Sequence, residues 1–130
     1  MSIGILQHVN VKTDDLKSTV DFWTDAIGLR DGDRPNFTFP GAWLYSGEEA
    51  VMHLIDISGT EEKAEKQTGS IDHVAFAAEG FGAFKDKLSG MGYEYEERIV
   101  PGGHLWQLFV RDPNGVLCEL NFDAAKEKAA

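Results

Sequence analysis

The chain has 130 residues, 42% of them hydrophobic and 26% charged, which is typical of one globular domain with a buried core. Its formal net charge of −10 argues against nucleic acid or an anionic membrane surface as a partner. No apolar run approaches the roughly 20 residues of a membrane span, and the lone cysteine excludes an internal disulfide, so we expect a cytoplasmic protein.

The sequence contains two similar stretches, LQHVNV at residues 6–11 and IDHVAF at residues 71–76. Their histidines, His8 and His73, are 73 − 8 = 65 positions apart. A pair of glycines is separated by 92 − 28 = 64 positions, and two ionisable residues late in each half by 119 − 53 = 66. Because three landmarks agree within one residue, we interpret the chain as an internal duplication.

The first half begins with a strand at residues 6–11, where apolar and polar residues alternate. A helix is predicted over residues 16–27, with Thr13 or Asp14 as its N-cap and Gly28 as a left-handed C-cap. Spacings of four, three and four give this helix one buried stripe, formed by Leu16, Val20, Trp23 and Ile27.

Two paired strands are predicted at residues 42–45 and 50–55, with Gly47 in the turn between them. The polar stretch at residues 58–70 joins the two halves. It is either disordered or a short exposed helix.

The second half repeats this plan from a strand at residues 71–77. The next helix has a stripe of Phe81, Phe84 and Leu88 and ends at residues 90–92. Three strands are expected at residues 93–100, 105–111 and 115–122. The DPNG sequence at residues 112–115 is the strongest turn signal in the chain, and the tail from Asp123 is expected to be a frayed helix.

Each half therefore reads as strand, helix and three strands. The predicted fold class is α+β, with two tandem βαβββ modules forming a curved mixed sheet around a cleft. We expect one domain over residues 1–130, divided into module one (about 5–57), a linker (about 58–70), module two (about 71–122) and a tail (123–130).

Four ionisable side chains lie on strand faces opposite most of their apolar neighbours: His8, His53, His73 and Glu119. If the two halves pair around a pseudo-twofold axis, these side chains converge. Three imidazoles and a carboxylate favour zinc, nickel, copper or iron over calcium and magnesium. Such an ion would act as a Lewis acid or lower the pKa of bound water.

A simpler interpretation applies to each residue alone, since a single strand histidine is more often a surface or hydrogen-bonded residue than a ligand. Glu119 is more unusual, because an unpaired buried carboxylate is costly, but Arg98 or Arg111 could pair with it. His104 follows two glycines and is expected in a loop at the cleft rim. Cys118 alternates away from Glu119 and is expected to be an inert buried thiol.

The doubled plan, with His-Val opening each half, resembles the vicinal oxygen chelate superfamily, as does FVRDPNGVLCEL at residues 109–120. That superfamily includes glyoxalase I, fosfomycin-resistance thiol transferases, methylmalonyl-CoA epimerase, extradiol dioxygenases and metal-free bleomycin-binding proteins. The resemblance covers about residues 5–122. It is more specific for fold than for function.

The resemblance implies that His8, His73 and Glu119 are metal ligands. The fourth-strand position falls on His53, where glyoxalase I usually has a glutamate and the epimerase a glutamine, so the chain departs from a strict lactoylglutathione lyase. His53 would be a fourth ligand or a catalytic base, its ordinary pKa near 6.5 suiting proton transfer. Relatives of this length commonly form homodimers, with His8 and His53 from one subunit meeting His73 and Glu119 from the other.

The leading functional interpretation is a metal-dependent glyoxalase-like lyase, isomerase or epimerase that acts on a small oxygenated substrate. Its cofactor would be a divalent ion (zinc, nickel, iron, manganese or cobalt), with His53 and Glu119 as catalytic residues. Candidate substrate contacts are Asn10, Trp43, His104, Gln107 and Phe109. The alternatives are an extradiol-type Fe(II) ring-cleaving dioxygenase and a metal-free binding or resistance protein of the bleomycin-binding type.

Overall fold

The computed structural model describes residues 1–129, in which two compact units divide the chain at Met1–Glu65 and Lys66–Ala130. We call these unit 1 and unit 2. Among the described residues, no helix is both long enough and apolar enough to cross a membrane.

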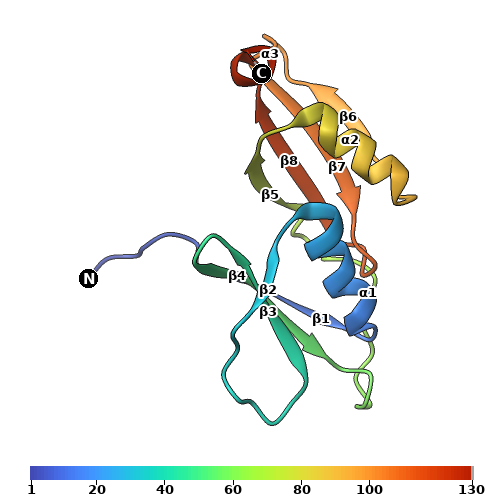
Figure 1. The fold of residues 1–130 in the computed structure, drawn as a ribbon. Coiled ribbons are helices and arrows are strands. Elements are labelled where there is room, and N and C mark those ends of the chain that lie inside the picture. The colour runs from blue at the N-terminus through green and yellow to red at the C-terminus, as the bar shows by residue number, and fades with distance from the viewer. Residues whose placement is uncertain (130) are drawn as a thin grey trace. The chain divides into compact units, whose positions relative to one another are not determined.

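Unit 1 contains one mixed four-stranded sheet with the strand order β1-β4-β3-β2 (Figure 1). β1 runs parallel to β4, and the other neighbours are antiparallel. Its elements are β1 (Val9–Thr13), α1 (Leu16–Asp21), the π-helical turn η1 (Phe22–Ile27), β2 (Arg30–Gly32), β3 (Gly41–Ser46) and β4 (Glu49–Asp56).

Unit 2 has the same topology, with the strand order β5-β8-β7-β6 and a parallel pair formed by β5 and β8. Its elements are β5 (His73–Ala78), α2 (Phe81–Gly90), β6 (Glu96–Ile99), β7 (Leu105–Arg111), β8 (Leu117–Asp123) and α3 (Ala124–Ala129). The predicted α+β class with two tandem βαβββ modules is therefore confirmed.

Strand alternation gives each sheet one buried face and one polar face. In β4, Met52 and Leu54 are buried while His53 between them is only half-buried. In β8, Cys118 and Leu120 are buried on either side of the half-buried Glu119. The apolar residues of β7 and β8 face α2, whose Phe81 and Phe84 rings contact Phe122.

The start of the chain differs from the prediction in register. β1 begins at Val9, so His8 precedes the strand, and Thr13 is buried at the strand's end instead of capping a helix. Its hydroxyl lies 2.9 Å from that of Thr19 in the core. The N-cap of α1 is Asp15, whose carboxylate accepts from the Ser18 amide.

The predicted helix ends where expected, since Gly28 has a left-handed φ of 106°. Its second half is a π-helical turn, which brings Phe22 into the core beside the predicted Trp23 and Ile27. A π turn is wider than an α turn, so neighbouring residues share the buried side. The 3.6-residue pattern could not predict Phe22.

The C-terminal tail forms the helix α3, which was expected to fray. The carboxylate of Glu127 instead anchors this helix to the start of α2. Glu127 Oε1 accepts from the amides of Gly80 (3.2 Å) and Phe81 (2.7 Å) at the start of α2. Gly80, the N-cap of α2, has no side chain to offer those amides. Glu127 therefore caps a helix 46 residues away in sequence.

β6 is also shorter than predicted, covering four residues instead of residues 93–100. The stretch at residues 58–70 has no helix or strand, so the short exposed helix considered there is absent from the described residues. The β3–β4 hairpin turns at Gly47, as predicted.

The predicted turn at residues 112–115 is present, and its Asp112 and Asn114 are buried. Asp112 Oδ1 accepts from the amides of Asn114 and Val116, both at 2.8 Å. Gly115 has a φ of +84°, and a Cβ at this position would lie 2.2 Å from the Lys66 carbonyl oxygen. This turn therefore needs glycine both for its dihedral angle and for space.

Substituting Gly115→Ala is expected to lower the free energy of unfolding by about 3 kcal/mol, the sum of left-handed strain and a backbone clash. The matched control is Gly103→Ala, because Gly103 has a φ of +74° but nothing within 4 Å of a Cβ. That variant is expected to lose about 1 kcal/mol. Chemical denaturation measures both, and equal losses would contradict the close contact with Lys66.

Candidate metal and substrate site

In unit 1 a stack of rings holds two predicted metal ligands together. The His8 and His53 rings lie within 14° of parallel, with centroids 3.8 Å apart. Trp43 stacks on His53 at 4.0 Å and 7°. Since β4 lies between β1 and β3, the His8 and Trp43 rings cover opposite faces of His53. A backbone hydrogen bond at Ala50 engages one ring nitrogen of His53, which leaves the other for a further partner.

Burial lowers the pKa of His53 below its ordinary value of 6.5, and the charges of His8 and Arg34 lower it further. A backbone hydrogen bond at Ala50 opposes these effects in part. His53 is therefore neutral at neutral pH, the form in which an imidazole binds a metal ion or accepts a proton.

In unit 2, His73 and Glu119 form the second pair. His73 Nε2 lies 3.6 Å from Glu119 Oε1, and the Glu119 side chain is only 12% exposed. His73 Nδ1 is 2.8 Å from Asp72 Oδ2. The hydrogen bond to Asp72 raises the pKa of His73, and the negative charge of Glu119 adds to the effect.

The residue before each histidine has the same role in both units. Gln7 Oε1 lies 2.9 Å from His8 Nδ1, as Asp72 Oδ2 lies near His73 Nδ1. A hydrogen bond from Nδ1 to an oxygen leaves Nε2 with its lone pair free, which is the usual arrangement behind a metal-binding histidine. The repeat therefore extends from the histidines to the groups that orient them.

A line of amide groups holds Glu119 in place. Asn121 Nδ2 donates to Glu119 Oε2 at 2.8 Å, and Gln107 Nε2 donates to Asn121 Oδ1 at 2.9 Å. Gln107 and Asn121 are direct partners across β7 and β8. Glu119 Oε2 is thus occupied by an amide, while Oε1 faces His73. In the described part of the chain, neither Arg98 nor Arg111 forms an ion pair with Glu119.

These donors suit a divalent transition metal. Ligands about 2.1 Å from a tetrahedral ion are roughly 3.4 Å apart, close to the 3.6 Å between His73 Nε2 and Glu119 Oε1. Within residues 1–129, neither unit by itself gathers three His, Cys, Asp or Glu side chains around one point. Each unit supplies a pair of donors.

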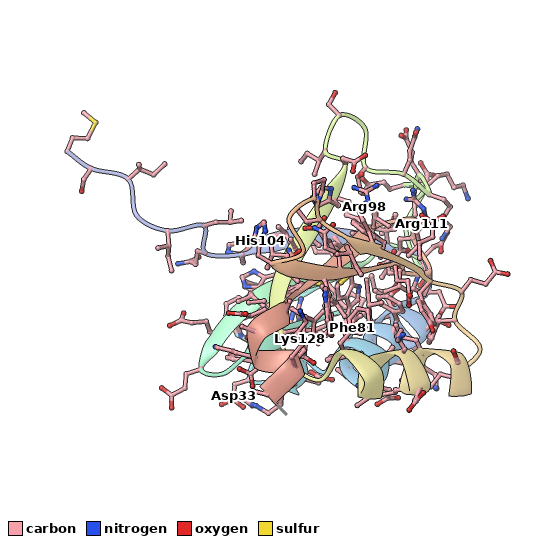
Figure 2. All side chains as sticks on the ribbon, turned by 90° about the horizontal axis from the view of Figure 1, so that it is seen from above. Asp33, Phe81, Arg98, His104, Arg111 and Lys128 are labelled. Carbon is pink, nitrogen blue, oxygen red and sulfur yellow. The ribbon has the colours of Figure 1, made fainter. Side chains whose placement is uncertain are left out.

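A cavity of about 1030 Å³ opens beside the second pair and is lined only by unit 2. Among its lining residues are His73, Glu119, Phe109, Tyr93, Tyr95 and Arg98. Ser89 of α2 and Gly92, just after that helix, also line the cavity. In Figure 2, Arg98 and Arg111 project from one side of the sheet, whereas Phe81 lies on the other. The sequence analysis placed the two tyrosines in a strand and not in the site; in the structure they precede β6, which begins at Glu96.

The remaining predicted contacts differ in their surroundings. Asn10 is exposed on β1, directly beside His53 of β4. His104 is an exposed loop residue, as predicted, and does not line the cavity in unit 2. Gln107 is engaged with Asn121. Cys118 is buried, and burial raises the pKa of its thiol to about 12, which agrees with the predicted inert side chain.

An aromatic cluster next to Trp43 was not predicted. The Phe37 and Phe39 rings stack at 5.0 Å, and Phe37 lies 6.3 Å from Trp43. The Arg34 guanidinium lies over both phenylalanine rings, at 4.8 and 5.1 Å. The sequence does contain a signal for this cluster. Phe37 and Phe39 alternate with a threonine between two prolines, which indicates two exposed rings on one side of an extended loop.

Comparison with known proteins agrees with this architecture. A putative glyoxalase family protein from Bacillus anthracis superposes with a TM-score of 0.74 at 20% identity, covering 95% of this chain and 98% of that one. A lactoylglutathione lyase from Escherichia coli O157:H7 is 32% identical over 127 residues, 88% of this chain and 90% of its own length. A probable lactoylglutathione lyase from Vibrio parahaemolyticus serotype O3:K6 is 28% identical over 126 residues, covering 92% and 91%.

The fold is thus that of glyoxalase-like proteins. The family model of the Glyoxalase/Bleomycin resistance protein/Dioxygenase superfamily matches residues 5–120, and the chain belongs to this superfamily.

The two histidines in β4 and β5 are expected to titrate on opposite sides of pH 6.5 in the metal-free protein, His53 below and His73 above. Trp43→Ala uncovers His53 and raises its pKa without moving that of His73. Asp72→Asn removes a carboxylate and lowers the pKa of His73 without moving that of His53. NMR titration of the imidazole signals measures the pKa values of His53 and His73 in the wild type and in both variants.

Each variant serves as the control for the other, since the two changes lie in different units. A common shift of both histidines in either variant would contradict the local causes given above.

Proposed function

We propose that this protein is a metal-dependent enzyme of the glyoxalase type, a lyase, isomerase or epimerase for a small substrate with neighbouring oxygen atoms. The observation that carries the proposal is the presence of two donor pairs at repeat-equivalent places, His8 with His53 and His73 with Glu119. The relatives named lactoylglutathione lyase support the same reaction class.

All four side chains are proposed ligands of one zinc, nickel, iron, manganese or cobalt ion. His53 is either the fourth ligand or, if three ligands hold the ion, the catalytic base. We further propose a homodimer in which one copy supplies His8 and His53 and the other supplies His73 and Glu119. Imidazole and carboxylate are donors that these ions accept.

The bound ion would supply a Lewis acid that stabilises negative charge on a substrate oxygen. The chain's own part is proton transfer and orientation. His53, neutral at neutral pH, is suited to take a proton from the carbon next to a carbonyl and return it to the adjacent carbon. Glu119 is the second proposed catalytic residue, held in one orientation by Asn121.

Substrate contacts are proposed at five predicted positions, of which Phe109 has the strongest support because it lines the cavity beside Glu119. Trp43 is a second proposed contact, because it stacks on His53. The other three proposed contacts are Asn10, His104 and Gln107.

An extradiol-type dioxygenase is the second candidate, because His8, His73 and Glu119 are the donors of the two-histidine, one-carboxylate iron site. Oxygen uptake with a catechol after anaerobic loading with Fe(II) supports this candidate. Formation of the thioester lactoylglutathione, the compound in the relatives' names, from glutathione and methylglyoxal supports the lyase.

Removal of one ligand is expected to lower the affinity for zinc at least about 100-fold, since each ligand contributes a large share of the binding free energy. The variants are His8→Ala, His73→Ala and Glu119→Gln, measured by competition with a chromophoric chelator. His104→Ala and Glu97→Gln are the controls, because one is an exposed loop histidine and the other pairs with Lys85.

Wild-type protein that binds no zinc, nickel, cobalt, manganese or iron would contradict the enzyme and favour the metal-free binding module. His53→Ala separates the two roles of that residue. Retained zinc with lost activity identifies a base, and lost zinc identifies a ligand.

The amide line predicts a smaller effect on metal binding. Asn121→Leu frees Glu119 Oε2 from its donor and is expected to weaken zinc binding about tenfold, the lower end for a residue behind a metal ligand. Gln107→Leu acts one bond further away and is expected to cost less. A zinc affinity of Asn121→Leu equal to that of wild type would show that Glu119 does not depend on this hydrogen bond.

A further inference from the structure

We propose that Arg98 is an anion-binding residue of the unit 2 cavity and holds a carboxylate carried by the substrate. The proposal rests on the function proposed above, because it names the class of substrate for the same site. That class is a small hydroxycarbonyl compound with a carboxylate at its far end.

Arg98 is placed in line with the groups that support Glu119. On β6 it pairs with Gln107 of β7, which pairs in turn with Asn121 of β8. These three residues form one row across the polar face of the sheet, and Phe109 with Glu119 forms the next row. Arg98 and Glu119 both line the cavity. Since adjacent strands are about 4.8 Å apart, β6 and β8 are separated by about 10 Å across β7, a distance that the long Arg98 side chain shortens enough for one small molecule to span.

The guanidinium of Arg98 has no ion-pair partner in the part of the chain that the structure describes. This is notable in a chain with 22 acidic residues against 12 basic ones. Its sequence neighbour Glu97 pairs instead with Lys85, at 3.1 Å. The other cavity arginine, Arg111, donates to the Gly115 carbonyl at 2.9 Å. Arg98 is therefore the cavity arginine whose N–H groups remain available.

Phe109 provides a platform for this arginine. The Arg98 guanidinium carbon lies 5.3 Å from the centre of the Phe109 ring, within the range of a cation–π interaction. Such a contact uses the flat face of the guanidinium and leaves the N–H edge free. That edge matches the two oxygens of a carboxylate, so the side chain is oriented before a ligand arrives.

The remaining charges of the cavity limit the anion to a single carboxylate. Four acidic residues also line it: Asp72, Glu94, Glu96 and Glu119. Asp72 and Glu119 are bonded to His73, at the opposite side of the sheet from β6. Glu96 lies on β6 with Arg98, and Glu94 lies just before that strand. The four carboxylates would repel a multiply charged phosphate, whereas the charge of a single carboxylate is matched by the Arg98 guanidinium.

The test uses malate and lactate as probes of the full-length protein. Both are 2-hydroxy acids, and malate alone has a second carboxylate. In the zinc-loaded protein, malate is expected to bind about tenfold more tightly than lactate. Arg98→Gln is expected to remove that difference, and Arg98→Lys to keep part of it. Isothermal titration measures the affinities, and circular dichroism checks that each variant is folded.

The matched control is Arg30→Gln, because Arg30 is also a strand arginine whose guanidinium lies over an aromatic ring, 4.8 Å from Tyr45 in unit 1. This variant is expected to keep the preference for malate. Equal weakening by Arg30→Gln and Arg98→Gln would show a general effect of charge and overturn the proposal, as would equal affinities of malate and lactate in the wild type.

A second measurement separates this proposal from the metal site. Malate is titrated into the metal-free protein while the arginine Nε–H signals are followed by NMR, with Arg98 assigned from the signal lost in Arg98→Gln. A shift of the Arg98 signal supports the anion site even if zinc does not bind. An Arg98 signal that does not move overturns the anion site, whatever the result for zinc.

Discussion

Each sheet of this protein buries one face, and that burial fixes the register of its strands. A shift of one residue would move Met52 and Leu54, or Cys118 and Leu120, out of the core and expose several apolar side chains at once. The same register places His53 and Glu119 on the opposite face. The position of the ionisable side chains is therefore held by the packing of their apolar neighbours.

The two donor pairs are held by different forces. In unit 1, flat rings on either side restrict His53, and desolvation by these neighbours lowers its pKa. In unit 2, hydrogen bonds restrict His73 and Glu119, and carboxylates raise the pKa of His73. A duplicated fold can thus carry one half-site that favours a neutral imidazole and another that favours a protonated one when no metal is bound.

Much of the fold follows from local patterns in the sequence. Neighbours close in the chain determine three features: the alternation of buried and half-buried residues along β4 and β8, the left-handed Gly28, and the turn at residues 112–115. The start of β1 was predicted too early because residues 6–8 alternate like a strand, yet β1 pairs with β4 only from Val9 onward. Pairing partners are not visible in a local pattern.

In the candidate site, too, some residues follow from local sequence patterns and others depend on contacts between distant segments. Periodicity identified the four ligand-type residues, whereas their partners depend on contacts between distant segments. Asn121 meets Gln107 across two strands, and Arg98 reaches Phe109 from β6 to β7. Tyr93 and Tyr95 alternate as in the predicted strand, yet they lie before β6, which begins only at Glu96. These groups require the strand register of unit 2, which a single sequence does not contain.

The contact between Glu127 and the first turn of α2 has a consequence for synthesis of the chain. Gly80 and Phe81 leave the ribosome long before their acceptor is made, because translation proceeds from the N-terminus. The first turn of α2 therefore lacks its cap until Glu127, 46 residues after Phe81, has emerged. Unit 1 has no such dependence among its described contacts, so it can finish folding while unit 2 is still being translated.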